Sequence, residues 1–448
     1  MPFGTRCTAL LSVTVTLLAL VAIASASDAE AVEARDRYIV VLHDSVDHPG
    51  AVAHTQTSQR DGRLGFVYRA VLNGYSAELP VQAVEGLRRD PRVKYVTVDG
   101  EVMLGAQTTP TGISRVFASS NKALDIDSVD DVRVNVDIAV IDTGVDGTHP
   151  DLNVFFRTDC SNGTEAEAKC VNSSGTDTNG HGTHVAGIAA AIDNGSGVVG
   201  TAPGARIWAV KALGTGTDYT SEIVAGIDWV TTMRKDGSPE NDIEVVNMSI
   251  WCSVNPLCPT KPMDEAITES VEAGVVHVVI AGNANADAKN YTPANSPDAI
   301  TVSALADSDG QSGGKGSTSC TDDFPGAHAT RFLTDDTKAS FSNYGATVEI
   351  AAPGVCILST YPSYEYKKVS GTSMAAPYVA GAAAVLAAQD PPKSKADVEE
   401  IAATLESEGN FGWTDTSPDG IKEPLLDVSD EAIFNLIRLP TVTTRLAF

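Results

Sequence analysis

Four polar residues of this 448-residue chain lie where buried elements are expected to begin or end. Asp142 and Asn283 each follow an apolar run, whereas His181 and Ser373 each open an apolar helical segment. A serine hydroxyl becomes an effective nucleophile beside a base, and the base needs a third group that fixes its tautomer. The pattern therefore predicts acyl transfer with Ser373 as the nucleophile and His181 as the base. Asp142 would orient that base, and the amide of Asn283 would donate a hydrogen bond to the oxyanion.

An α/β arrangement is expected to position these residues from about residue 105 onward. Apolar runs of strand length alternate there with longer segments of helical character. The expected strands cover 136–141, 205–211, 243–248, 275–280 and 299–303, and the expected helices cover 181–192, 221–233, 263–273 and 373–388. This alternation predicts a three-layer domain with a mostly parallel central sheet and a site at the carboxyl ends of its strands.

A separate small unit is expected ahead of this domain. Strand character appears over 38–42, 66–79 and 94–98, with a turn at Asn73-Gly74, and helices are expected near 49–60 and 81–89. The resulting order is β-α-β-β-α-β, which is the ferredoxin-like α+β arrangement.

The first residues have the features of a secretory signal peptide. A largely apolar run over 10–23 precedes Ala24-Ser25-Ala26, a cleavage signature of small residues. The alternative is a membrane anchor, but the run is shorter than the roughly 20 residues of a spanning helix. We therefore expect a signal peptide over 1–26, the small domain over 27–104 and the main domain over 105–448, with the mature protein secreted to the extracellular space.

Cysteine usage agrees with export. Cys7 would leave with the signal peptide, and an even number of cysteines remains, which is typical of disulfides in a secreted chain. Several pairings are possible, and nearest-neighbour closure gives Cys160–Cys170, Cys252–Cys258 and Cys320–Cys356. The alternative is a zinc site, but the cysteines and histidines lack the spacing of zinc ligands.

The formal net charge of −27 limits the classes of partner. So acidic a surface repels nucleic acid and anionic membranes, and we expect neither as a partner. The same charge favours solubility and the binding of cations.

The reactive residues lie in motifs that resemble those of the subtilisin-like serine proteases, most closely the proteinase K-type branch. These motifs are Asp142-Thr143-Gly144-Val145-Asp146, residues 179–187, residues 281–288 with 290–294, Phe341-Ser342-Asn343-Tyr344-Gly345, Ala352-Pro353-Gly354 and residues 371–377. The resemblance covers about residues 105–440. Residues 74–98 are similar to the inhibitory propeptide of the same family.

The resemblance implies a secreted serine endopeptidase that cleaves peptide bonds through an acyl-enzyme intermediate. It implies a subtilisin-like fold, broad specificity with an apolar preference at the residue before the cleaved bond, and a monomer. The propeptide would act as an intramolecular chaperone and inhibitor until the enzyme cleaves itself near Leu104 or Gly105.

The resemblance also implies where an extended peptide substrate binds. The substrate-binding residues would be Gly214, Thr215, Gly216, Ser249, Ile250, Trp251, Ala281 and Gly282. Trp251 departs from the family, which commonly has glycine there. This leaves open whether Trp251 alters the pocket or packs beside the proposed Cys252–Cys258 loop.

No cofactor is expected for catalysis, but the resemblance implies calcium as a structural ion. Its ligands would be the carbonyl oxygens of Pro297 and Ala299 and the carboxylate of Glu349, and such oxygen ligands suit calcium. The alternative is a solvated Glu349.

The sequence offers two other functional classes. Gly310-Gln311-Ser312-Gly313-Gly314 matches the G-x-S-x-G motif of α/β-hydrolase esterases, but no helix is expected after it. A non-catalytic descendant that only binds peptides is the second alternative, and the presence of all four catalytic residue types argues against it.

Overall fold

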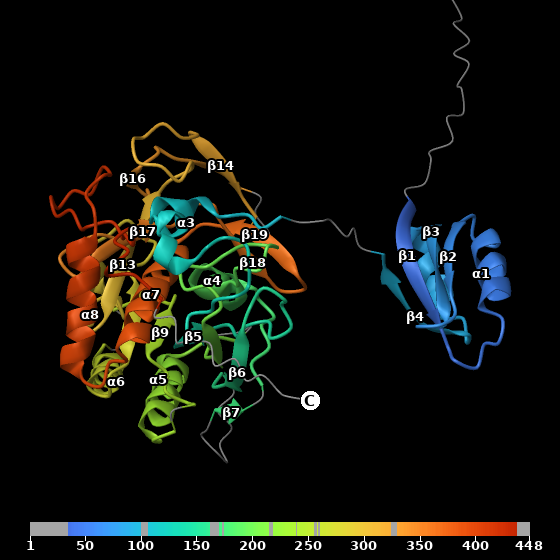
Figure 1. The fold of residues 1–448 in the computed structure, drawn as a ribbon, viewed down its shortest axis with the longest axis horizontal. Coiled ribbons are helices and arrows are strands. Elements are labelled where there is room, and N and C mark those ends of the chain that lie inside the picture. Colours follow the sequence, from blue (N-terminus) through green and yellow to red (C-terminus); the bar gives the residue numbers. More distant parts are fainter. Residues whose placement is uncertain are drawn as a thin grey trace, which may run out of the picture. The chain divides into compact units, whose positions relative to one another are not determined.

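The computed structural model describes residues 35–99, 106–161, 170–172, 174–214, 218–238, 240–254, 258, 260–323 and 329–436. The chain divides into two compact units, the first ending at Leu104 and the second beginning at Gly105 (Figure 1). The expected signal peptide over 1–26 lies outside the described residues. Among those residues, no helix is both long and apolar enough to cross a bilayer.

The N-terminal unit has the ferredoxin-like arrangement. Its elements are β1 (Arg35–Leu42), α1 (Pro49–Ser58), β2 (Arg63–Tyr68), β3 (Gly74–Pro80), α2 (Val81–Arg88) and β4 (Val93–Val98). The strands form one antiparallel sheet in the order β2-β3-β1-β4. Val40, Leu42, Tyr75, Leu79 and Leu87 form its fully buried core, so this unit has a core of its own.

A mostly parallel sheet forms the centre of the C-terminal unit. Among the described residues it has nine strands in the order β16-β13-β11-β9-β5-β8-β6-β7, with β17 also pairing with β13. The strands are β5 (Asp137–Asp142), β6 (Val154–Asp159), β7 (Val171–Asn172), β8 (Arg206–Lys211), β9 (Val245–Met248), β11 (Val276–Ile280), β13 (Ile300–Ala306), β16 (Thr337–Lys338) and β17 (Ile350–Pro353). The pairs from β6 to β17 are parallel, and only the edge strands β7 and β16 pair antiparallel.

Helices cover both faces of this sheet. They are α3 (Thr111–Arg115), α4 (His181–Ala190), α5 (Thr220–Lys235), α6 (Lys261–Glu272), α7 (Thr372–Gln389) and α8 (Lys395–Glu408). Gly182 of α4 packs on Asp142, whereas Gly226 of α5 packs on Ile141. Because neighbouring residues of a strand point to opposite faces, α4 and α5 lie on opposite sides of β5 (Figure 1). This is the predicted three-layer order.

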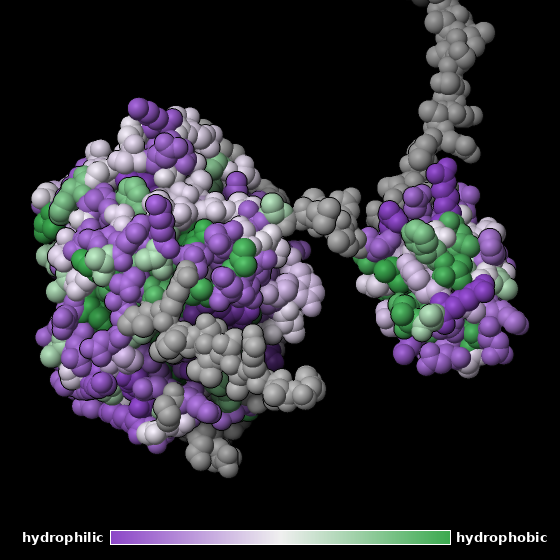
Figure 2. Space-filling view, in the orientation of Figure 1, coloured by the Kyte–Doolittle hydropathy of each residue, from purple (hydrophilic) through white to green (hydrophobic). Residues whose placement is uncertain are grey.

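Short antiparallel pairs and three disulfides complete the unit. The pairs are β10 (Cys252–Ser253) with β12 (Tyr291–Thr292), β14 (Ser319–Asp322) with β15 (Ala329–Phe332), and β18 (Ile357–Tyr361) with β19 (Glu365–Val369). The disulfides are Cys160–Cys170, Cys252–Cys258 and Cys320–Cys356, which is the nearest-neighbour pairing. On the face of the C-terminal unit seen in Figure 2, hydrophilic residues predominate and apolar ones are scattered, in keeping with the acidic composition.

Candidate active site

The residues that the sequence singles out gather at the carboxyl edge of the parallel sheet. Asp142 is the last residue of β5 and is fully buried, and His181 is the first residue of α4. Asn283 follows β11, and Ser373 is the second residue of α7. The fold therefore brings together groups from four separate elements.

Asp142, which is buried, and His181, which is partly exposed, form a close pair. The Nδ1 atom of His181 lies 2.8 Å from Oδ1 and 2.9 Å from Oδ2 of Asp142. Gly182 permits this approach, because a Cβ atom there would lie 2.1 Å from the carbonyl oxygen of Gly144. Burial opposes the charged imidazole, but the charge and hydrogen bond of Asp142 outweigh it, so the pKa of His181 is raised.

A second carboxylate, Asp177, fixes the segment that carries His181. Its Oδ1 accepts hydrogen bonds from the backbone N–H groups of Asn179 (2.9 Å) and Gly180 (2.8 Å), and its Oδ2 accepts from that of Thr183 (3.0 Å). It thus satisfies N–H groups at the start of α4, and its charge also raises the pKa of His181. The prediction missed Asp177, although an aspartate four residues before a glycine-flanked helix start is a signal for such a role.

His184 differs from His181 although the two lie one helix turn apart. It is fully buried, and its Nε2 lies 2.9 Å from the carbonyl oxygen of Lys367. Burial lowers the pKa of His184 to about 4, so the ring stays neutral near pH 7. His184 therefore packs inside the fold, and His181 is the histidine of this helix that faces the cleft.

The backbone at Ser373 is held by a neighbouring serine. Pro377 lies inside α7 and lacks the N–H that would bond the carbonyl oxygen of Ser373. The hydroxyl of Ser249 donates to that oxygen instead, at 2.9 Å, and itself accepts from the Nδ2 of Asn247 at 2.9 Å. The Ser373 Oγ lies 3.4 Å from the carbonyl oxygen of Ser249. Ser249 therefore fixes the first turn of α7 against the end of β9.

Asn283 is oriented by the start of α7. Its Oδ1 accepts hydrogen bonds from both the backbone N–H and the Oγ1 of Thr372, each at 2.9 Å. This leaves the Nδ2 amide as the group that Asn283 can offer to a bound molecule. The N–H of Ser373 belongs to the first turn of α7 and needs no partner within the helix. Two donors are therefore available beside the Ser373 hydroxyl.

These groups open into one cleft of about 640 Å³. Its described lining residues are Thr143, Asn179, His181, Leu213, Gly214, Asp218, Ser249, Ile250, Trp251, Asn283, Asp322, Phe341, Val369, Ser370, Gly371, Ser373 and Met374. Of the predicted substrate-binding residues, Gly214, Ser249, Ile250 and Trp251 line this cleft. Ala281 and Gly282 are buried and are not among these lining residues, whereas Thr215 and Gly216 lie outside the described residues.

The disulfide-bonded hairpin beside the cleft was not predicted. No strand was expected over residues 307–323, but the end of this segment forms β14, which contributes Asp322 to the cleft. Cys320 joins this strand to Cys356. The polar composition of the segment hid the strand, because its pairing with β15 is local and only Asp322 among its four residues is buried.

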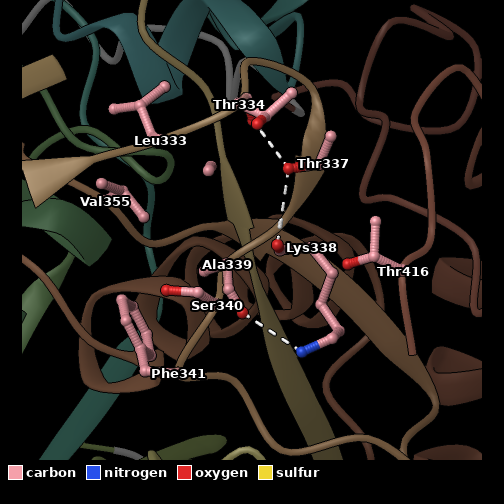
Figure 3. A pocket seen from close by; sticks show the side chains of 10 residues that line it. Leu333, Thr334, Thr337, Lys338, Ala339, Ser340, Phe341, Val355 and Thr416 are labelled. Atoms are coloured by element: carbon pink, nitrogen blue, oxygen red, sulfur yellow. Dashed lines mark hydrogen bonds between the residues drawn. The ribbon is translucent and has the colours of Figure 1, made fainter. Parts of the chain in front are cut away.

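A second cavity of about 380 Å³ adjoins the cleft (Figure 3). Phe341 lines both spaces, while Leu333, Val355 and the stem of Lys338 lie around the second one. The Nζ of Lys338 is held by the carbonyl oxygens of Ala339 (3.2 Å) and Ser342 (3.0 Å). None of the four predicted catalytic residues lines this cavity, whereas His181, Asn283 and Ser373 line the larger cleft.

The G-x-S-x-G segment has no nucleophile elbow. Ser312 lies in a bend, and its Oγ donates a 2.8 Å hydrogen bond to the carbonyl oxygen of Gly412. Residues 313–318 are bends or coil, so no helix follows the serine. The esterase alternative therefore finds no support in this segment.

The residues proposed for calcium lie at the paired starts of β13 and β17. Glu349 precedes β17, and its Oε2 accepts a 2.7 Å hydrogen bond from the N–H of Thr301 in β13. Ala299 immediately precedes β13 and Pro297 is close by in sequence. Burial raises the pKa of Glu349 to about 8, so its anion is poorly stabilised by the protein alone. A half-buried carboxylate of this kind fits a hard cation better than it fits a solvated surface group.

Comparisons with known proteins agree with this geometry. The subtilase family matches residues 134–418, and the peptidase inhibitor I9 family matches residues 37–104. An alkaline protease of Alkalihalobacillus alcalophilus is 35% identical over 344 residues, which cover 75% of this chain and 76% of the relative. Subtilisin E of Bacillus subtilis strain 168 is 33% identical over 347 residues, which cover 77% of each.

A solved structure supports the fold. This structure is described as proteases from Pseudoalteromonas arctica PAMC 21717. It superimposes with a TM-score of 0.54 at 28% sequence identity, and the match covers 72% of this chain and 98% of the solved chain. The family match spans more than half of the chain and the relatives exceed 30% identity. This chain therefore belongs to the subtilase family of serine endopeptidases and carries an inhibitor I9 propeptide at its N-terminus.

Proposed function

We propose that Asp142, His181, Ser373 and Asn283 are the catalytic residues of this endopeptidase. The observation that carries the proposal is one cleft lined by His181, Ser373 and Asn283, in which Asp142 holds the imidazole through Nδ1. With Nδ1 bonded to a carboxylate, the imidazole presents Nε2 as the atom that accepts a proton.

The mechanism follows from these positions. Nε2 of His181 takes the hydroxyl proton of Ser373 while Oγ attacks the carbonyl carbon of the scissile peptide bond. Asn283 Nδ2 and the Ser373 N–H stabilise the oxyanion, aided by the amino end of α7. His181 then protonates the leaving amine, which breaks the peptide bond and leaves an ester on Ser373. Water, deprotonated by His181, hydrolyses that ester and restores the hydroxyl.

The substrate is proposed to lie extended along the cleft. Gly214 with the neighbouring Thr215 and Gly216 would border it on one side, and Ser249–Trp251 on the other, so that the peptide pairs with enzyme backbone like an added strand. Apolar lining residues, including Leu213, Ile250 and Met374, favour an apolar side chain near the cleaved bond.

The precursor would be exported and would process itself. An endopeptidase has to be kept inactive before export. The propeptide unit would provide the inhibitor, and it ends near Leu104. We propose a signal peptide over 1–26, a propeptide over 27–104 that assists folding and inhibits, and a secreted monomeric enzyme over 105–448. The acidic composition supports an extracellular protein that binds neither nucleic acid nor anionic membrane.

Hydrolysis of casein tests the proposed reaction. We expect the purified mature protein to digest casein and to react with a fluorophosphonate at Ser373, as located by mass spectrometry of the labelled peptide. Hydrolysis of a short ester such as p-nitrophenyl butyrate without casein digestion would instead indicate an esterase. A folded protein without labelling would indicate a non-catalytic descendant.

Calcium is proposed to bind Glu349 and the carbonyl oxygens of Pro297 and Ala299. When bound, the ion would supply positive charge beside this half-buried carboxylate and join the starts of β13 and β17. The ion takes no part in the proposed chemistry at Ser373, because these ligands are not among the lining residues of the cleft.

Removing calcium is expected to lower stability. At a calcium concentration about 100 times Kd the ion stabilises by about 2.7 kcal/mol, so in a domain of this length EGTA should lower Tm by roughly 4 °C. Glu349→Gln should remove this calcium dependence, whereas Glu269→Gln on the exposed face of α6 should retain it. Scanning calorimetry of the fluorophosphonate-inhibited enzyme avoids autolysis. An equal effect of EGTA on Glu349→Gln and on the wild type would contradict the assignment.

A further inference from the structure

Trp251 lies in the cleft near the proposed nucleophile, Ser373. It lines the cleft, and the residue is 38% exposed. It follows Ser249 and Ile250, of which Ser249 holds the carbonyl oxygen of Ser373. Trp251 is therefore two residues from the contact that fixes the reactive serine, on the segment expected to border a bound peptide.

The indole lies beside Gly282, which belongs to the segment that leaves the adjacent strand. Strands β9 and β11 are parallel neighbours, with Met248 paired to Val279, so residues 249–251 and 281–283 lie on either side of one gap. A Cβ atom on Gly282 would lie 3.7 Å from the Cδ2 atom of Trp251, which is van der Waals contact. Gly282 is buried and is not a lining residue, whereas Trp251 is. The indole therefore covers the wall that Gly282 would otherwise offer to a substrate.

The indole is also fixed from behind. The ring of Tyr291 packs against it edge-on, with centroids 5.2 Å apart and an interplanar angle of 65°. Strand β10 pairs with β12 and sets Ser253 opposite Tyr291, and the Cys252–Cys258 disulfide begins at the next residue after Trp251. This packing resists rotation of the indole, since the ring packs on Tyr291 and the backbone of the next residue, Cys252, is paired with Thr292.

We propose that Trp251 determines the side-chain specificity of the enzyme by closing the pocket beside Ser373. A substrate with a small apolar side chain, such as alanine or valine, before the cleaved bond fits above the indole. A phenylalanine or tyrosine side chain meets the indole and cannot enter the gap between residues 249–251 and 281–283. This inference rests on the proposed function and assigns it a substrate class.

A series of peptide p-nitroanilides tests the inference. The probes are succinyl-Ala-Ala-Pro-X-p-nitroanilides in which X is alanine, valine, leucine or phenylalanine. Wild type is expected to have a kcat/KM for alanine at least about 10-fold above that for phenylalanine, as a misfit of this size in an apolar pocket predicts. Trp251→Gly should reverse this order by raising kcat/KM for phenylalanine about 10–100-fold, and Trp251→Phe should fall between the two.

Controls separate this inference from the proposed function. Phe411→Ala removes an exposed aromatic ring that is not a cleft residue and should leave the order of the four substrates unchanged. Fluorophosphonate labelling counts the active sites in every preparation, so each kcat refers to folded enzyme. If Trp251→Gly does not fold, Trp251→Phe still has to shift the ratio toward phenylalanine.

Two results have distinct meanings. A labelled wild type that prefers phenylalanine, or a labelled Trp251 variant with an unchanged ratio, overturns the inference and leaves the proposed function intact. A folded wild type that neither labels nor cleaves any of the four probes contradicts the proposed function, and the inference is lost with it.

Discussion

Replacing Ser373 with alanine is expected to lower kcat by about 10⁶, because the change removes the atom that bonds to the substrate carbonyl. The residual rate would come from the oxyanion donors and from substrate binding alone. The fold should be unaffected, since alanine suits the first turn of α7 and the Ser249 hydroxyl still donates to the backbone carbonyl of residue 373. The same variant should remain at precursor size if the enzyme cleaves its own propeptide.

The measurement compares mature chains. A trace of affinity-tagged wild-type enzyme first cleaves the propeptide from the variant and is then removed. Hydrolysis of a peptide p-nitroanilide by the mature variant is then followed. Ser312→Ala is the matched control, because Ser312 carries the G-x-S-x-G match yet binds only the carbonyl oxygen of Gly412 among the described contacts. If activity survives in Ser373→Ala and is lost in Ser312→Ala, Ser312 and not Ser373 is the nucleophile.

Much of the main domain was predictable because its strands are buried on both faces. All six residues of β5 are buried, and such runs identify parallel strands without knowledge of their neighbours. Once parallel strands are assigned, their carboxyl ends must share one edge, which places Asp142 and Asn283 together. The predicted helices containing His181 and Ser373 begin at that edge in the structure as well.

The elements that escaped prediction are stabilised by contacts that a local pattern does not encode. Strand β18 buries Ser359 and Thr360, whose hydroxyls donate to the carbonyl oxygens of His184 (2.8 Å) and Thr183 (2.8 Å). These polar residues conceal the strand, and their partners lie far away in sequence. Helix α8 is mostly polar, although the spacing of its buried residues Val398, Ile401 and Leu405 is helical and was a usable signal.

The position of Trp251 is another feature that the sequence alone did not determine. The sequence left two interpretations, a changed pocket or packing beside the Cys252–Cys258 loop. The structure agrees with both: the indole packs on Tyr291, next to the pairing of β10 with β12, and it also lies beside Gly282. Two-residue strands carry too little pattern to predict such a pairing, so the pocket shape required coordinates.

Replacing Asp142 with asparagine is expected to lower kcat at neutral pH by about 10⁴, the size of the effect of this change in serine proteases. An asparagine amide that donates to Nδ1 of His181 leaves the proton on Nε2, so the imidazole cannot accept the proton of Ser373. Asp130→Asn, at a surface carboxylate paired with Arg133, is the matched control and should keep full activity.

The pH dependence of the Asp142→Asn variant separates a catalytic role from structural damage. Neutral His181 is the active base, so wild-type activity rises as pH increases through the raised pKa of that histidine. Without the charge of Asp142, burial dominates and lowers this pKa, and the rising limb of the kcat/KM profile should move to lower pH. Partial unfolding would reduce the rate without moving the limb. If kcat of the variant stays within tenfold of wild type, or if the rising limb of its profile stays in place, Asp142 is not the residue that orients the imidazole and stabilises its protonated form.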